Sequence, residues 1–581
     1  MIEFGPFRLD AARRVVWKAD ALLPVPPKAA EILAALAARA GEVVTKQELL
    51  ALVWPGTFVE EANLSVNVST LRRVLGCQDD GQPYIQTLHR RGYRFLGRPR
   101  LEPASGPSVL AVLPFATLGA EDEPVLGVGM ADALITRLAR TGRLVVRPTS
   151  AILRYAGPRD PVQAGRELAA DAVLDGTLLR HADRLRCSVQ LLPIAAQLRP
   201  WAEAFDAAYH DLFAVQNTLA ERVAAALELE LNSVERARLR AQPTTDLAAY
   251  EAYARGRHLW GQFTPASLPK ALTAFEAAAA RDPAYAAPHA GLADLYIVTA
   301  FSGLLPPSEA WRLAGEAADR ALACDADSPE AHVAKAYVLL LGAWDFAGAE
   351  QELLRARDGA PHSAATLQWL GLFQAVLGRL DDSAASLRQA RALDPASVVI
   401  ESLEAFLALL RGDRPSELAA AQRAADLEPR RFLGHWSLGL ALLRAGRAAE
   451  AVAAHQRALE LAEGAPLVRA VLARTLALAG RRPEARRLLA ELRRLPHASA
   501  YQCATVHLAL GEAAPALVCL ETAVAAREPW VVWLVVDPMF AAIRRNRRFR
   551  ALVERVFGAA TAAPRRGSRR SAAAAPRRGF S

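Results

Sequence analysis

The segment Tyr84–Phe95, YIQTLHRRGYRF, places three arginines and one histidine around Gly92, between residues that favour β-strands. Guanidinium groups bind phosphate oxygens through charge-assisted, often bidentate hydrogen bonds. Residues 81–101 contain five arginines and no acidic residue. We therefore expect a basic hairpin that contacts a polyanion, the alternative being a solvated turn that only aids solubility. The candidate binding residues of this hairpin are His89, Arg90, Arg91 and Arg94.

A helix is expected immediately before the hairpin, over residues 60–76, EEANLSVNVSTLRRVLG. Four apolar side chains recur at helical spacing and predict the buried seam: Leu64, Val68, Leu71 and Leu75. The opposite face carries Val66, Ser69, Thr70 and Arg73, with Asn67 and Arg72 on its flanks. Small polar side chains around one arginine suit a helix in a DNA major groove, where arginine reads guanine edges. A solvated surface helix is the alternative.

The segments before this helix predict the scaffold that positions it. Residues 4–10 and 14–20 alternate like two short strands around a turn, and a helix opens at Pro27 and closes at Gly41. A second helix follows, with Thr45 and Glu48 at capping-box spacing and Pro55 as its stop. Three helices followed by a basic hairpin form the winged-helix arrangement, in which the hairpin is the wing.

These residues resemble the OmpR/PhoB-type winged-helix domain in the version found in ToxR/CadC-like regulators. The resemblance covers residues 3–97 and rests on LVWPG, the helix above and the pattern I-x-T-x-x-x-RGYRF. It implies base-reading side chains near Asn67, Ser69 and Thr70, and phosphate contacts near Arg72 and the wing. The family often has His or Arg at those base-reading positions, so its base preference does not transfer. No receiver domain of the phosphorelay family precedes the winged helix, so phosphorylation control is not expected.

Residues 108–240 mix strand-like and helical stretches and resemble a TolB-like α/β module, which implies no catalytic role. Within it, GVGMAD (Gly127–Asp132) lacks the third glycine and the downstream acid of a dinucleotide site. RPTS (Arg147–Ser150) is interpreted as a strand-end turn, with anion binding as the alternative. The sequence contains no P-loop, HExxH or GxSxG motif.

Residues 245–558 are predicted to be helical and periodic. Gly378, Gly412, Gly446 and Gly480 recur at steps of 34 residues, and Pro361, Pro395 and Pro429 recur with the same step. A glycine at the middle turn and a proline at the end indicate a helix–turn–helix unit. The region resembles the tetratricopeptide repeat, with about eight units, and such solenoids bind partner proteins in a groove.

Charge and cysteine content narrow the class of protein. The chain of 581 residues has a net charge of +9, but six arginines lie in residues 561–581, which contain no acid. The remainder is therefore nearly balanced, and a nucleic-acid interface must be local. Five scattered cysteines predict reduced thiols, and no apolar run approaches the roughly 20 residues of a membrane helix. We expect a cytoplasmic protein without a membrane segment.

The predicted architecture is multi-domain. It comprises a winged helix (α+β, residues 1–98), a linker (99–107), a TolB-like α/β module (108–240), an all-α tetratricopeptide solenoid (245–558) and a disordered tail (559–581). The predicted function is a sequence-specific, double-stranded-DNA-binding transcriptional regulator whose repeats bind a protein partner, RNA polymerase being one candidate. The alternative is a repeat scaffold or adaptor whose winged helix contacts protein. We expect no enzymatic activity, cofactor or metal, and the sequence leaves the oligomeric state open.

Overall fold

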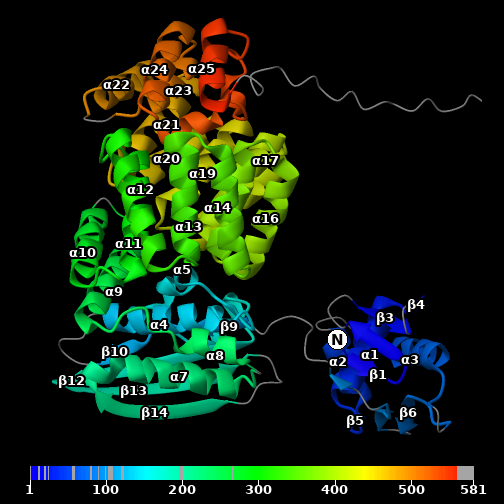
Figure 1. Cartoon of the computed structure of the whole chain (residues 1–581). Coiled ribbons are helices and arrows are strands. Elements are labelled where there is room, and N and C mark those ends of the chain that lie inside the picture. The colour runs from blue at the N-terminus through cyan, green and yellow to red at the C-terminus, as the bar shows by residue number, and fades with distance from the viewer. Residues whose placement is uncertain are drawn as a thin grey trace, which may run out of the picture. The chain divides into compact units, whose positions relative to one another are not determined.

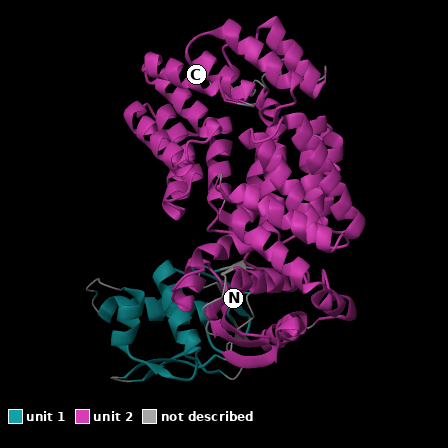
Figure 2. Ribbon diagram, turned by 90° about the vertical axis from the view of Figure 1, so that its left-hand side faces the viewer, with its two compact units in different colours: residues 1–108 teal, residues 109–581 magenta. Residues whose placement is uncertain are grey.

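The computed structural model describes residues 2–10, 14–18, 21–23, 25–54, 59, 61–78, 81–88, 91–97, 100–101, 109–118, 124–194, 200–229, 231–262, 264, 266–495 and 498–558 (Figure 1). The chain divides into two compact units, residues 1–108 and 109–581 (Figure 2). The predicted tail at 559–581 lies outside the described residues. No helix in the described segments combines the length and apolarity that crossing a bilayer requires.

Unit 1 is an α+β domain in which three helices pack against two small antiparallel sheets. The first sheet has the order β4-β3-β2-β1-β8, and the second has the order β5-β7-β6. The elements are β1 (Ile2–Phe4), β2 (Phe7–Asp10), β3 (Val15–Lys18), β4 (Ala21–Leu22), α1 (Pro27–Ala38), β5 (Val43–Val44), α2 (Lys46–Val53), α3 (Glu61–Leu75), β6 (Ile85–Leu88), β7 (Gly92–Phe95) and β8 (Arg100–Leu101).

The sheet over the first 22 residues differs from the sequence prediction. The prediction of a single strand over residues 4–10 was wrong. A turn at Gly5, with φ of 53°, separates β1 from β2. Strand β8 lies in the predicted linker and pairs with β1, Ile2 opposite Leu101. The β2–β3 hairpin agrees with the prediction of two strands around a turn.

An aromatic cluster joins the first sheet to the hairpin. The ring of Phe4 lies edge-on to Phe95, with centroids 5.0 Å apart, and edge-on to Tyr84 at 5.6 Å. Phe7 completes the cluster against Tyr84 at 5.4 Å. Edge-to-face aromatic pairs contribute about 0.5–1.5 kcal/mol beyond their buried area. The base of the hairpin is therefore fixed by residues more than 70 positions away.

Unit 2 begins with an α/β module. Its sheet has the order β11-β9-β12-β13-β14, and β10 pairs with β12. Strands β9, β10 and β11 run parallel to their neighbours, whereas β12, β13 and β14 form an antiparallel meander. The elements are β9 (Val109–Val112), β10 (Ala116–Leu118), α4 (Pro124–Ala139), β11 (Val145–Val146), α5 (Thr149–Ile152), η1 (Leu153–Tyr155), α6 (Pro161–Glu167), β12 (Ala172–His181), β13 (Arg184–Pro193), β14 (Trp201–Ala208), η2 (Tyr209–Asp211), α7 (Leu212–Ala226) and α8 (Ser233–Arg240).

The glycines of GVGMAD lie inside α4 and serve helix packing. A side chain at Gly127 would place its Cβ 1.9 Å from the carbonyl oxygen of Phe115. One at Gly129 would lie 3.0 Å from Ala254, on the first helix of the solenoid. The two glycines therefore allow close approach on two sides of α4 rather than forming a phosphate-binding loop.

The rest of unit 2 is a tetratricopeptide-type solenoid, in which α9–α24 form eight consecutive helical pairs among the described residues (Figure 1). The elements are α9 (Leu247–Gln262), α10 (Ser267–Arg281), α11 (Ala286–Ser302), α12 (Pro307–Cys324), α13 (Pro329–Tyr337), the π-helical turn η3 (Val338–Ala343), α14 (Phe346–Gly359), α15 (Ala364–Val376), α16 (Leu380–Leu393), α17 (Val398–Arg411), α18 (Arg414–Leu427), α19 (Phe432–Arg444), α20 (Ala448–Leu461), α21 (Pro466–Leu478), α22 (Arg482–Leu492), α23 (Ala500–Ala509), α24 (Ala513–Ala525), η4 (Pro529–Trp533), η5 (Pro538–Phe540) and α25 (Arg547–Phe557).

The four glycines at 34-residue steps follow the first helix of four consecutive pairs, α15, α17, α19 and α21, in the left-handed conformation. Their φ angles are 71° at Gly378, 76° at Gly412, 81° at Gly446 and 83° at Gly480. After Gly446, the amide of Arg447 donates to the carbonyl of Leu442 at 2.9 Å, which closes the helix end. The 34-residue step thus reflects a backbone requirement repeated in four consecutive units.

The segment after the last repeat pair folds back against the first helices of earlier repeats. Trp530 packs edge-on to Phe301 of α11 at 5.1 Å, and Trp533 packs edge-on to Phe406 of α17 at 4.8 Å. The indole of Trp311 donates to the carbonyl of Arg527 at 2.9 Å. The apolar segment Pro529–Val536 therefore packs against α11 and α17, the first helices of two earlier repeats.

Arg147 joins the α/β module to the solenoid. Only 2% of its surface is exposed, and its guanidinium donates to the carbonyls of Ala392, at 2.9 Å, and Ala169, at 2.8 Å. It also donates to Leu393 at the last turn of α16, where a cation complements the helix dipole. The strand-end interpretation of RPTS is consistent with this role, since both terminal nitrogens of the arginine donate to backbone carbonyls inside the protein.

Candidate nucleic-acid interface

Helix α3 is positioned by its apolar seam. The four predicted seam residues are all buried, at exposures of 0–4%, and the helix packs against α1 and α2. Full burial of each such side chain contributes about 1.5–3 kcal/mol. The helix ends before Gly76, whose φ is 68°. Helix α2 begins with the predicted capping box, in which the Glu48 amide donates to Thr45 Oγ1 at 3.2 Å.

The side chains on the outward face of α3 are available to contact a ligand. Val66 is 64% exposed, and Ser69 and Arg73 are also exposed. Asn67 Nδ2 donates to the Asn63 carbonyl at 2.8 Å, and Thr70 Oγ1 donates to the Val66 carbonyl at 3.1 Å. Arg73 makes no hydrogen bond or ion pair with any described residue. These side chains bond at most to their own helix, so they are free to exchange those contacts for a ligand's.

Arg72, on the flank of α3, contacts the hairpin. Its Nε donates to the Ile85 carbonyl at 2.9 Å, and a terminal nitrogen donates to Thr87 Oγ1 at 2.6 Å. The same guanidinium that the family resemblance assigns to a phosphate contact thus holds β6 against α3. Sequence reasoning missed this role, because nothing in the local pattern shows which strand a flank residue reaches.

The wing contains the paired strands β6 and β7, and Arg91 lies in a turn just before β7. Ile85 pairs with Phe95 and Leu88 pairs with Gly92. Arg91 is exposed in the turn, and Arg94 is half-buried, with an Nε that has no acceptor among the described residues. His89 and Arg90 lie outside the described residues. Of the four predicted wing residues, the structure therefore describes two, one exposed in the turn and one half-buried on β7.

Gly92 is required by the backbone beside it. Its φ is 143°, and a Cβ at this position would lie 2.1 Å from the Val44 carbonyl oxygen of the neighbouring strand β5. This close approach explains the glycine at the centre of RGYRF, since no side chain fits there. The close approach lets β7, which carries Arg94 and directly follows Arg91, pair with β5.

A further cation lies at the N-terminal end of α3. Lys46 Nζ, in the first turn of α2, forms an ion pair with Glu61 Oε2 at 2.6 Å. The hydrogen bond and the charge of Glu61 raise the pKa of Lys46 above its ordinary value. Sequence reasoning missed Lys46, although a lysine opening the helix before α3 was the available signal. Among the residues described, no three His, Cys, Asp or Glu side chains are placed to hold a metal ion.

Comparisons with known proteins find family models that match unit 1 and the α/β module of unit 2. Residues 20–95 match the family model described as "Transcriptional regulatory protein, C terminal". Unit 1 is therefore a winged-helix domain of the kind found in transcriptional regulators. Residues 106–222 match the model described as "HilA/YgeH-like transcriptional regulator, second domain".

The chain is also similar to individual proteins. It is 28% identical over 316 residues to the transcriptional regulator HilA of Salmonella typhimurium, which covers 53% of this chain and 55% of HilA. It is 29% identical over 237 residues to a putative adenylate cyclase 3 of Rhizobium meliloti, with 40% of each chain covered. The chain thus spans about half the length, or less, of these curated relatives. A solved structure, the DNA-binding domain of E. coli CadC, is 24% identical, with a TM-score of 0.16, and the match covers 17% of this chain and 95% of that one.

Proposed function

We propose that the protein is a transcriptional regulator that binds a specific site on double-stranded DNA through unit 1. The observation that carries the proposal is the outward face of α3, where, among the described residues, Arg73 has no partner and the polar side chains bond only to their own helix. The winged-helix family match and the similarity to HilA support it.

In this proposal α3 enters the major groove. Arg73 donates to a guanine edge, Ser69, Thr70 and Asn67 contact neighbouring bases, and Val66 meets a thymine methyl. The wing contributes affinity rather than sequence choice, since Arg91, Arg94 and the undescribed His89 and Arg90 contact phosphates. Arg72 links α3 to the wing, because its hydrogen bond to Ile85 holds the wing in register with the helix.

The repeat region is proposed to bind a protein partner, for which RNA polymerase is one candidate, and the protein is proposed to have no enzymatic activity and to act in the cytoplasm. The segment Pro529–Val536 already covers the first helices of several repeats. A partner of the repeats therefore either displaces this segment or contacts another surface of the solenoid.

The experiment that tests DNA reading is recovery of genomic fragments by the purified full-length chain at near-physiological salt, followed by footprinting. A small enriched set that shares one motif and one protected length supports the proposal. Uniform recovery of all fragments, with no footprint, would instead favour the scaffold interpretation.

A further inference from the structure

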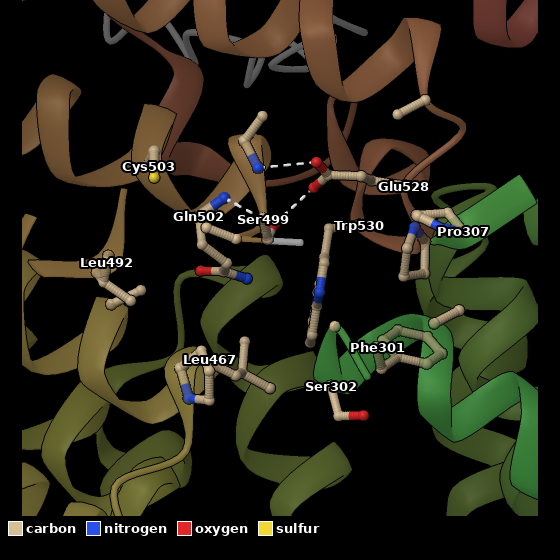
Figure 3. A pocket seen from close by; sticks show the side chains of 18 of the residues that line it. Phe301, Ser302, Pro307, Leu467, Leu492, Ser499, Gln502, Cys503, Glu528 and Trp530 are labelled. Atoms are coloured by element: carbon tan, nitrogen blue, oxygen red, sulfur yellow. Dashed lines mark hydrogen bonds between the residues drawn. The ribbon is translucent and has the colours of Figure 1, made fainter. Parts of the chain in front are cut away.

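A cavity of about 290 Å³ lies where early and late repeats of the solenoid meet (Figure 3). Residues around the end of α11 and the start of α12 form one wall, while α21, α23 and η4 form the others. Its lining is mostly apolar and includes Phe301, Pro307, Leu467, Leu492 and Trp530. A concave, largely apolar site with a few polar groups is the usual form of a small-molecule pocket.

Two polar groups in the cavity wall have no partner within the described part of the chain. The side chain of Gln502 is directed into the cavity (Figure 3), although only 7% of this residue is exposed. The side-chain amide of Gln502 makes no hydrogen bond with a described residue. The indole Nε1 of Trp530 is buried and also lacks an acceptor. A buried donor without a partner has a free-energy cost that a suitable ligand would remove.

The carboxyl group of Glu528, which also lines the cavity, is already engaged. It accepts hydrogen bonds from Ser499 Oγ at 2.6 Å and from the backbone amides of Ala500 and Tyr501, at 2.7 and 3.1 Å. Burial raises the pKa of Glu528, and these three donors oppose that shift. Glu528 thus caps the N-terminus of α23, and both of its oxygens already accept hydrogen bonds. As a carboxyl group beside the cavity, it disfavours an anionic ligand.

We propose that this cavity binds an uncharged, mainly apolar small molecule that carries a carbonyl-type acceptor. The amide of Gln502 and the indole N–H of Trp530 donate to that acceptor, while the prolines and Phe301 contact the apolar body. The proposal is independent of DNA binding by unit 1, because the cavity lies entirely within unit 2.

The test uses three fluorinated probes of similar size, followed by ¹⁹F NMR on the full-length chain. 4-Fluoroacetophenone supplies a neutral acceptor, 1-ethyl-4-fluorobenzene has none, and 4-fluorobenzoate is anionic. We expect the ketone to bind in the millimolar range, as ligands of about ten non-hydrogen atoms do. The benzoate should bind more weakly than the ketone. Equal binding of the ketone and the benzoate, or no binding of the ketone, would overturn the proposal.

Variants locate the site. Gln502→Leu keeps most of the volume but removes the amide, and should lower the ratio of ketone to hydrocarbon affinity about fivefold. Trp530→Phe should lower the same ratio by removing the indole N–H, and it provides a second variant if the first does not fold. Leu467→Trp fills the cavity and should abolish binding of all three probes. The control Gln456→Leu, at an exposed position of α20, should change nothing. An unchanged ratio in folded Gln502→Leu or Trp530→Phe would contradict the assignment.

Discussion

Arg72 of α3 donates through Nε to the carbonyl oxygen of Ile85 in β6, at 2.9 Å, and a terminal nitrogen of the same guanidinium reaches Thr87. One side chain therefore links the candidate base-reading helix to the wing. The planar fork of arginine is what allows two acceptors on one strand to be held at once.

Replacing Arg72 by Met should destabilise unit 1 by about 1–2 kcal/mol, because two charge-assisted hydrogen bonds at a half-buried position are lost. It should also weaken binding to every DNA sequence, since the wing loses its register. Chemical denaturation and binding to specific and scrambled duplexes measure the two effects. Arg73→Met is the matched control for stability, since Arg73 is exposed and bonds to no described residue. Equal stability of the two variants would argue against the link.

Gly92→Ala should be among the most destabilising single substitutions in unit 1. The new Cβ would lie 2.1 Å from the Val44 carbonyl, so β5 or β7 must move. We expect a loss of about 3 kcal/mol or more in the free energy of unfolding. Gly81→Ala is the control, because its φ is 79° but nothing lies within 4 Å of the added carbon. That variant should lose only about 1–2 kcal/mol, the cost of the left-handed conformation.

Arg147→Met should loosen the joint between the α/β module and the solenoid. The substitution leaves the carbonyls of Ala169 and Ala392 without their donor in a buried position, and we expect a loss of about 2–3 kcal/mol. Denaturant unfolding should also become less cooperative. The control is Arg143→Met, which removes an exposed ion pair with Glu235. A surface pair of this kind contributes under about 1 kcal/mol, so comparable losses in both variants would contradict the docking role.

The buried imidazole of His455 should make the stability of unit 2 depend on pH. Burial, assisted by the charge of Arg474, lowers its pKa to about 4, while a hydrogen bond with the Trp436 carbonyl opposes the shift. The unfolded chain binds this proton near pH 6.5 and the folded chain only near pH 4. The stabilising contribution of neutral His455 is therefore complete above pH 6.5 and is lost as the pH falls towards 4.

The measurement is the free energy of unfolding of the wild type and of His455→Leu between pH 7.5 and pH 4. The difference between them isolates His455 from the buried carboxyl groups, whose raised pKa values act in the opposite sense. We expect the wild type to lose about 1.4 kcal/mol per pH unit relative to the variant through this window. A difference that does not change with pH would show that His455 is protonated equally in both states.

The parts of the fold that depend on short-range patterns were predictable from the sequence. The seam of α3, the capping box of Thr45 and Glu48, and the 34-residue glycine step each follow from a backbone or helical periodicity, and the structure confirms them. Strand β8 was not predictable, because its two residues gain a strand conformation only by pairing with β1.

The candidate site likewise has features that were predictable from the sequence and features that were not. The outward position of Val66, Ser69 and Arg73 follows from helical geometry alone, as the structure shows. The contact of Arg72 with Ile85 does not, because it depends on how a hairpin 13 residues later packs against the helix. The fold-back of Trp530 onto Phe301 was equally hidden, since the two residues meet only when the repeats curve.

The most direct test of the account measures the affinity of the full-length chain for its footprinted site and for a scrambled duplex, as a function of salt, in wild type, Arg73→Ala and Arg91→Ala. Arg73→Ala should reduce the preference for the specific site by about 1–3 kcal/mol and leave binding to the scrambled duplex nearly unchanged. Arg91→Ala should weaken binding to both duplexes and lower the salt slope by about one. If neither variant changes the ratio of specific to scrambled affinity or the salt slope, α3 and the wing do not read DNA and the account is wrong.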